Sequence, residues 1–213
     1  MVGAVAVVSP TAQEPAIVSG RVEIGVPIAF RRPSAAYPSR AVAATTLAPE
    51  SERRNVVVYV RDAQSQAVAP MRAAIRQEDE RFIPRVVAVT VGSEVEFPND
   101  DPIYHNVFSL SRVKTFNLGR YPRGETRRVR FDEPGIVKVF CDIHSHMSAI
   151  VMVFDHSLFA VPDAAGRFEL PAMPEGNHQI TAWHARLGDT TIRIRVEAGQ
   201  TNAADFVLPV PEE

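Results

Sequence analysis

The stretch Val139-Phe140-Cys141-Asp142-Ile143-His144-Ser145-His146-Met147 joins two apolar, β-branched runs, residues 135–140 and 149–154. Residues of this kind favour strands, so the segment between them is expected to be a tight loop. That loop carries a thiol, an imidazole and a thioether, each three residues apart. Cys141 is the only cysteine, so it forms no disulfide within the chain. The residues around Cys141 indicate whether it is a buried packing residue or a functional thiol.

A second histidine, His105, opens another predicted strand upstream of this loop. Two imidazoles and a thiolate in a trigonal arrangement, with a weak axial thioether, are the ligand set of a blue-copper electron-transfer site. We therefore interpret His105, Cys141, His144 and Met147 as candidate ligands of one copper ion. The sulfur ligands would hold Cu(I), and the imidazoles suit both Cu(I) and Cu(II).

Other interpretations of these residues stay open. Cys141 could be a buried apolar residue with His144 and Met147 packing beside it, which leaves His105 unexplained. Zinc also suits a cysteine and two histidines, although a structural zinc site normally takes a fourth strong ligand rather than methionine. His146 could compete with His144, but the Cys-x2-His spacing favours His144 and leaves His146 as a solvated residue.

Over roughly residues 72–154 the chain resembles the cupredoxins. The likeness is carried by the Cys-x2-His-x2-Met loop, Asn99, the turn and strand of residues 92–97, His105-Asn106-Val107 and Pro134-Gly135. The short ligand loop is similar to that of the amicyanin subgroup, whereas plastocyanin and azurin have longer loops. The resemblance implies copper ligands at His105, Cys141, His144 and Met147. It also implies that Asn106 ties the two ligand loops together.

Nearly every periodic segment of the chain indicates a strand. No segment indicates a helix of ten residues or more, although residues 70–80 could hold a turn or two. The predicted fold is all-β: a cupredoxin Greek-key β-sandwich plus a smaller β-sandwich module. The predicted divisions are a truncated export signal (1–15), N-terminal strands (16–66), the copper domain (67–155) and the second module (156–210).

The second module resembles the carboxypeptidase regulatory-like fold, a small transthyretin-type sandwich. The likeness rests on residues 163–168 and on residues 174–180. The usual first strands of that fold look like Ser19-Gly20-Arg21-Val22 and Val56 to Val60, which precede the copper domain. We therefore hypothesise that the copper domain is inserted into the outer sandwich. Alternatively, the N-terminal strands extend the copper domain.

Composition and charge exclude several classes of protein. A chain of 213 residues with 46% hydrophobic and 23% charged residues is globular, and its net charge of -2 argues against a nucleic-acid binder. No apolar run reaches the ~18 residues that cross a bilayer. The N-terminus indicates export to the periplasm or the extracellular space. Seven basic residues from Arg112 to Arg130 are either a solvated sheet face or a docking patch for an acidic redox partner.

These features predict an exported one-electron carrier between redox partner proteins rather than an enzyme. Multicopper oxidases and copper nitrite reductases would need further histidine clusters. The domain arrangement resembles that of exported methylamine-utilisation proteins, but no partner is identified. The alternative is a copper-handling or surface-binding β-sandwich protein without electron transfer. The remaining histidines receive structural interpretations: His156 in a linker, His178 after a turn, and His184 at the surface or capping a strand, beside a core Trp183.

Overall fold

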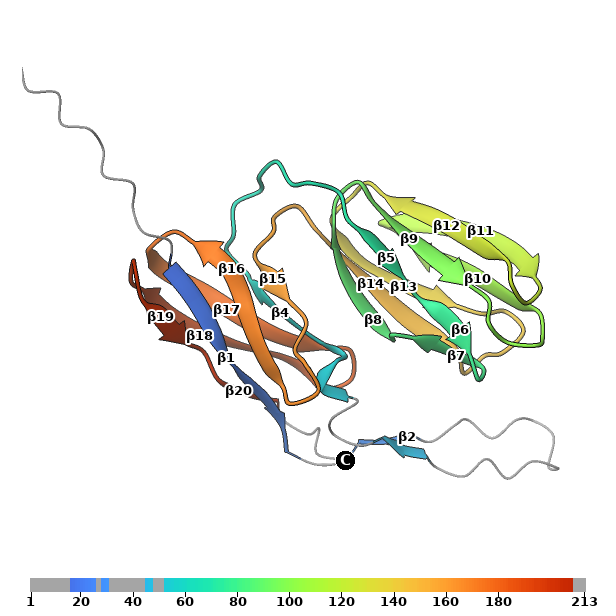
Figure 1. Ribbon diagram of the computed structural model, residues 1–213, viewed down its shortest axis with the longest axis horizontal. Helices are drawn as coiled ribbons and strands as arrows, with labels where there is room; N and C mark the ends of the chain where they lie inside the picture. The colour runs from blue at the N-terminus through green and yellow to red at the C-terminus, as the bar shows by residue number, and fades with distance from the viewer. Residues whose placement is uncertain (1–15, 26–27, 31–44, 48–51, 209–213) are drawn as a thin grey trace, which may run out of the picture.

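The computed structural model describes residues 16–25, 28–30, 45–47 and 52–208. The predicted export signal, residues 1–15, lies outside them. The regular secondary structure of the described part is almost entirely strand, so the all-β prediction is confirmed. No helix of the described part is long and apolar enough to cross a membrane. The strands fall into two groups, which we call the inner unit and the outer unit (Figure 1).

The inner unit comprises β5 to β14. Its larger sheet has the strand order β11 (Lys114–Tyr121), β10 (His105–Ser111), β13 (Gly135–Phe140), β14 (Ser148–Phe154) and β8 (Val86–Thr90). The smaller sheet has the order β12 (Thr126–Phe131), β9 (Ser93–Pro98) and β5 (Arg72–Ala74). A separate hairpin joins β6 (Arg76–Glu78) to β7 (Arg81–Ile83). Valine and phenylalanine side chains from both sheets form one core, so the unit is a β-sandwich.

The alternating pattern of β9 shows why this sheet forms. Ser93, Val95 and Phe97 point into the core, whereas the intervening glutamates point outward. Glu96 lies opposite Arg128 on β12 and accepts a 2.9 Å hydrogen bond from its guanidinium. The strand therefore buries one face and pairs charges across the other.

Residues 70–80 do not form the turn or two of helix that the sequence allowed. They supply β5 and β6, because β5 pairs in parallel with β9 and the N–H of Ile75 donates to the carbonyl of Glu96. Ile75 is fully buried in the core. Tertiary pairing with β9 overrides the weak local preference of this segment.

The outer unit contains strands from both ends of the chain. β1 (Ala16–Ile24) pairs with β16 (Arg167–Met173), β19 (Thr201–Ala203) and β20 (Phe206–Leu208). β4 (Val56–Val60) lies between β15 (Phe159–Ala160) and β17 (Gly176–His184), and β18 (Gly188–Val196) completes that sheet. β2 (Ile28–Phe30) and β3 (Thr45–Leu47) pair antiparallel in a two-stranded sheet of their own. Thus β1 and β4 pair with strands that follow the inner unit along the chain.

A glycine permits the close approach of β1 to the C-terminal strands. A Cβ atom on Gly20 would lie 2.0 Å from the carbonyl oxygen of Ala204, so no larger side chain fits without a shift of backbone. The two sheets of the outer unit share a second core, to which β1, β4, β16, β17 and β20 all contribute. This unit is the smaller β-sandwich.

An apolar cluster joins the two units. Val57 of the outer unit packs with Val86, Met152 and Phe154 of the inner unit, and Trp183 borders the cluster. Phe154 also contacts the rings of Tyr59 and Phe159, at centroid distances of 5.2 Å and 4.7 Å. The larger sheet of the inner unit is therefore partly covered by the outer unit on its β8 and β14 side.

Candidate metal centre

Three of the four predicted ligands meet at one end of the inner unit. His105 is the first residue of β10, Cys141 directly follows β13, and His144 lies in the loop that leads to β14. The Nδ1 atoms of the two histidines are 3.0 Å apart. The Sγ of Cys141 lies 3.9 Å from each of them. Among the described residues, this is the group of His, Cys, Asp or Glu whose donor atoms converge closely enough to hold a metal ion.

The triangle of donor atoms has the dimensions of a metal site. In protein zinc sites, the bond to imidazole is about 2.0–2.1 Å and the bond to thiolate about 2.3 Å. A point in the plane of this triangle about 2.0 Å from both nitrogens lies about 2.3 Å from the sulfur. One ion therefore fits all three donors without movement of the chain.

Met147 supplies the remaining candidate donor. Its side chain is 1% exposed and packs in the same apolar cluster as Cys141. Its backbone N–H donates to the carbonyl of His144 at 2.9 Å, which tightens the loop. The described part of the chain brings no fourth His, Cys, Asp or Glu into the cluster. A thioether as fourth neighbour suits copper better than a structural zinc site.

The burial of the donors is unequal. His105 is fully buried and Cys141 nearly so, whereas His144 is half-buried. Burial, together with the neighbouring His105 ring, holds the pKa of His144 below its ordinary value. A neutral imidazole is the form that binds a metal. The centre is thus closed to solvent on the side of His105 and open at His144.

A buried carboxylate that was not among the predicted site residues holds His105. The Nε2 of His105 lies 2.6 Å from Oδ2 of Asp101. Burial alone would raise the pKa of Asp101. Hydrogen bonds from the N–H of Glu80, from His105 and from the N–H of Asp79 outweigh it and keep that pKa below its usual range. The signal that could have found Asp101 is an acid four residues before a candidate ligand, in a segment rich in turn residues.

Asn106 links the two segments that carry the donors. Its Oδ1 accepts a long hydrogen bond, 3.4 Å, from the N–H of Asp142, directly after Cys141. Its Nδ2 donates to Oδ1 of Asn117 on β11 at 2.8 Å. Asn99 shapes the same end of the unit, because its amide donates to the carbonyls of Ile103 and Tyr121. These hydrogen bonds hold the segments on either side of His105 in place.

His146 is not the solvated residue that the sequence analysis expected. Its side chain is only 25% exposed, and its Nε2 lies 3.5 Å from Oε2 of Glu80. The ring stands 6.1 Å from that of His144, centroid to centroid, and does not join the donor triangle. The expectation failed because Glu80, in the β6–β7 hairpin and distant in sequence, lies beside His146.

Two further histidines are also more buried than expected. His156 is nearly buried against the ring of Phe154, and its Nδ1 accepts the N–H of Leu158 at 3.1 Å. His184 is buried and lies 2.9 Å from Oε2 of Glu52, so its placement at the surface was wrong. It does cap the turn that follows β17. Trp183 lies at the junction of the units rather than inside one core.

The basic stretch from Arg112 to Arg130 is largely neutralised. Five of its seven cations each lie within 4 Å of a carboxylate: Lys114–Asp132, Arg120–Asp142, Arg127–Glu125, Arg128–Glu96 and Arg130–Asp132. Exposed pairs of this kind contribute little to stability. They also reduce the field that would attract an acidic partner, which favours the solvated-face interpretation of this stretch.

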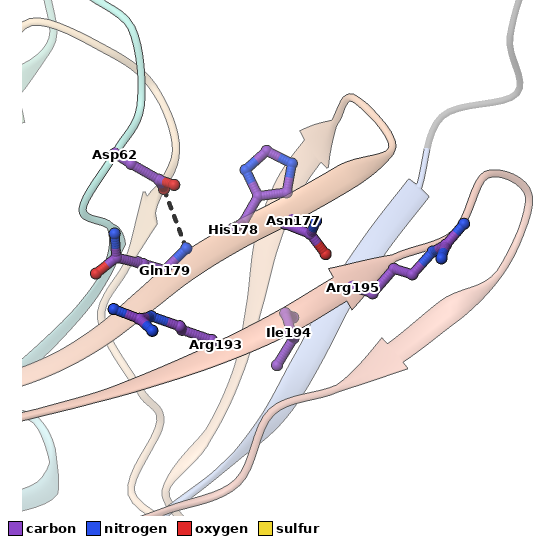
Figure 2. A pocket seen from close by; sticks show the side chains of 7 residues that line it. All are labelled: Asp62, Asn177, His178, Gln179, Arg193, Ile194 and Arg195. Atoms are coloured by element: carbon purple, nitrogen blue, oxygen red, sulfur yellow. Dashed lines mark hydrogen bonds between the residues drawn. The ribbon is translucent and has the colours of Figure 1, made fainter.

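A separate hollow of about 400 Å³ lies on the outer unit, over β17 and β18 (Figure 2). Asp62 borders it and accepts the N–H of Gln179 at 3.1 Å, while Arg193 and Arg195 project from β18. Its lining is mostly exposed and polar, on an open sheet face. It brings no cluster of metal donors together, so we place the functional centre at His105, Cys141 and His144.

Comparisons with known proteins yield distant structural likeness alone. No protein-family model matches the chain, and no curated protein matches it. The chain is similar to a copper-containing nitrite reductase from Thermus scotoductus, at 24% identity and a TM-score of 0.38 over 45% of this chain. It spans 25% of the length of that reductase.

Two smaller proteins are similar over most of their own length. A purple cupredoxin from Nitrosopumilus maritimus has 24% identity and a TM-score of 0.36, covering 38% of this chain and 99% of its own. Amicyanin from Paracoccus versutus has 19% identity and a TM-score of 0.37, covering 46% of this chain and 97% of its own. At these scores, the assignment of the site rests on donor geometry.

Proposed function

We propose that this chain is a cupredoxin-type protein that binds one copper ion through His105, Cys141, His144 and Met147 and transfers single electrons between redox partner proteins. The observation that carries the proposal is the triangle of two Nδ1 atoms and one Sγ, 3.0 Å and 3.9 Å apart. Two imidazoles and a thiolate beside a thioether are the donors of trigonal copper sites. Copper, when bound, supplies the one-electron couple.

The chain's own residues favour electron transfer over catalysis. His105, Cys141 and Met147 are buried, which limits the access of water to the centre. The three donor atoms also lie at the distances from one another that a shared metal ion requires. The protein therefore needs little structural change when the ion gains or loses an electron. A catalytic copper centre needs room for a substrate beside the metal. The enclosure of this one argues against an enzyme.

His144 is the proposed path for the electron. It is the half-buried member of the donor set, and the neighbouring Ile143 is exposed. Ile103 and Tyr104, directly before His105, are exposed as well. Exposed apolar side chains around a buried centre suit short-lived contact with a partner protein. We place partner docking here, rather than at the paired cations between Arg112 and Arg130.

The outer unit is proposed to be a carboxypeptidase regulatory-like sandwich into which the inner unit is inserted. The pairing of β1 and β4 with strands from the far end of the chain supports the insertion. Export to the periplasm or the extracellular space is proposed from the N-terminal sequence. A link to methylamine utilisation rests on the resemblance of the domain arrangement.

The test is addition of Cu(II) to the purified protein with its thiol reduced, followed by visible absorption and electron paramagnetic resonance. We expect an intense thiolate-to-copper band with narrow copper hyperfine splitting, absent in Cys141→Ser. His144→Gln should weaken or displace the band, and the matched control His146→Gln should keep it, because His146 lies outside the triangle.

Voltammetry of the copper-loaded protein then separates the two function classes. A reversible one-electron wave supports the electron carrier. A coloured protein without such a wave is a copper-handling protein. A colourless protein, or one that prefers zinc to copper, contradicts the proposed centre.

A further inference from the structure

The carboxylate of Asp101 receives hydrogen bonds from two separate segments of the inner unit. Its Oδ1 accepts the N–H of Asp79 at 2.6 Å, and its Oδ2 accepts the N–H of Glu80 at 2.9 Å. Oδ2 also lies 2.6 Å from Nε2 of His105. We propose that Asp101 is a positioning residue: it fixes the proton of His105 on Nε2 and so aims the free Nδ1 lone pair at Cys141 and His144. This inference rests on the proposed function.

The proton must lie on the imidazole side of this contact. A backbone N–H can only donate, so both oxygens of Asp101 already act as acceptors toward Asp79 and Glu80. An ionised carboxylate has no proton to donate, so the remaining partner, Nε2 of His105, is the donor. A neutral imidazole that carries its proton on Nε2 has none on Nδ1, the atom that faces the other two donors.

The same carboxylate holds an unusual turn. Asp79 and Glu80, at the tip of the β6–β7 hairpin, have φ angles of 52° and 53°. Two consecutive residues other than glycine rarely adopt this left-handed conformation. Both donate their N–H groups to Asp101, which offsets the cost of the conformation.

This turn connects Asp101 to the ligand loop. Held at the hairpin tip, Glu80 places its carboxylate 3.5 Å from Nε2 of His146, two residues after His144. One buried side chain thus joins His105, the hairpin tip and, through Glu80, the loop of Cys141 and His144. Removal of a carboxylate that accepts a hydrogen bond from a metal-binding histidine typically lowers metal affinity by about 10–100-fold.

Asp101→Ala tests this role, with Asp100→Ala as the matched control. Asp100 carries the same charge at the adjacent position, but it pairs with Arg76 at the surface instead of with His105. We expect Asp101→Ala to weaken Cu(II) binding about 10–100-fold and Asp100→Ala to change it by less than about threefold. Wild-type affinity in Asp101→Ala would overturn the inference.

A second measurement needs no copper and no variant. Two-bond ¹H–¹⁵N correlation spectra of the metal-free wild-type protein report which nitrogen of His105 carries the proton. A proton on Nε2 supports the inference, and a proton on Nδ1 overturns it even if Asp101→Ala does not fold. If the wild-type protein binds no Cu(II) while His105 is protonated on Nε2, the proposed function fails and the positioning by Asp101 stands.

Discussion

His105 in the inner unit and His184 in the outer unit share one local arrangement. Both rings are buried, and the Nε2 of each lies beside a carboxylate: Asp101 at 2.6 Å for His105, and Glu52 at 2.9 Å for His184. Both carboxyl groups have lowered pKa values, because these hydrogen bonds and others outweigh the effect of burial. The two pairs differ at the opposite ring nitrogen.

The Nδ1 of His184 accepts the N–H groups of Arg186 and Leu187, at 3.3 Å and 3.2 Å. The Nδ1 of His105 instead faces the thiol of Cys141 and the ring of His144. A buried histidine–carboxylate pair therefore does not by itself make a metal site. The partner of the second nitrogen decides whether the pair holds the fold together or leaves a lone pair for a ligand.

Removal of His184 should give the largest effect on stability. His184→Ala leaves Glu52 buried without its main donor and uncovers two backbone N–H groups, so we expect a loss of about 3–5 kcal/mol in the free energy of unfolding. Urea unfolding followed by the fluorescence of Trp183, the only tryptophan, reports the effect. The control is His178→Ala on the same strand. The ring of His178 is hydrogen-bonded to the carbonyl of Pro174. This control substitution should cost less than about 1 kcal/mol.

The same variant separates the two units. Because His184 does not touch the donor triangle, Cu(II) affinity of His184→Ala should stay at the wild-type value under conditions where the protein is folded. If copper binding and stability fall together, the two histidine pairs are coupled and the contrast between them is lost.

Substitution of Glu52 should have a smaller effect. Glu52→Gln keeps an oxygen that can accept from His184 and removes only the charge, so we expect a loss of about 1–2 kcal/mol. Urea unfolding measures it against Glu169→Gln, an exposed glutamate of the same unit. A Glu52→Gln loss as large as that of His184→Ala would show that the charge, rather than the hydrogen bond, stabilises the pair.

His156 extends the comparison to a buried histidine whose pKa is lowered by burial, with Asp155 acting in the opposite sense. The unfolded chain then binds the proton more readily, so the contribution of His156 is complete above about pH 6.5 and is lost as the pH falls, by at most about 1.4 kcal/mol per pH unit. His156→Asn keeps an acceptor for the N–H of Leu158 and does not titrate. Denaturant midpoints are measured at one pH above 6.5 and at one pH below it. From the higher to the lower pH, the midpoint should fall less in His156→Asn than in wild type. An equal fall would exclude His156 as the cause.

His105, Cys141 and His144, predicted as ligands from the sequence, do converge in the structure. The prediction was possible because Cys141, His144 and Met147 lie within seven residues of one loop. Their spacing carries chemical information without any knowledge of the fold, and His105 adds the missing imidazole. The residues that support the donors were harder to find. The contacts of Asp101 with Asp79 and Glu80 depend on the β6–β7 hairpin, and residues 70–80 gave a weak local signal that tertiary pairing overrode.

By itself, the sequence determined the all-β class and the kinds of donor atom at the centre, because strand periodicity and donor identity are local properties of the chain. Only the tertiary structure decided that Asp79 and Glu80 donate to Asp101, that Glu80 reaches His146, and that Glu52 pairs with His184. Partners such as Glu52 and His184 are far apart along the chain, so no local pattern records them. Their proximity is set by strand pairing, which brings β4 alongside β17 and closes the outer unit around that pair.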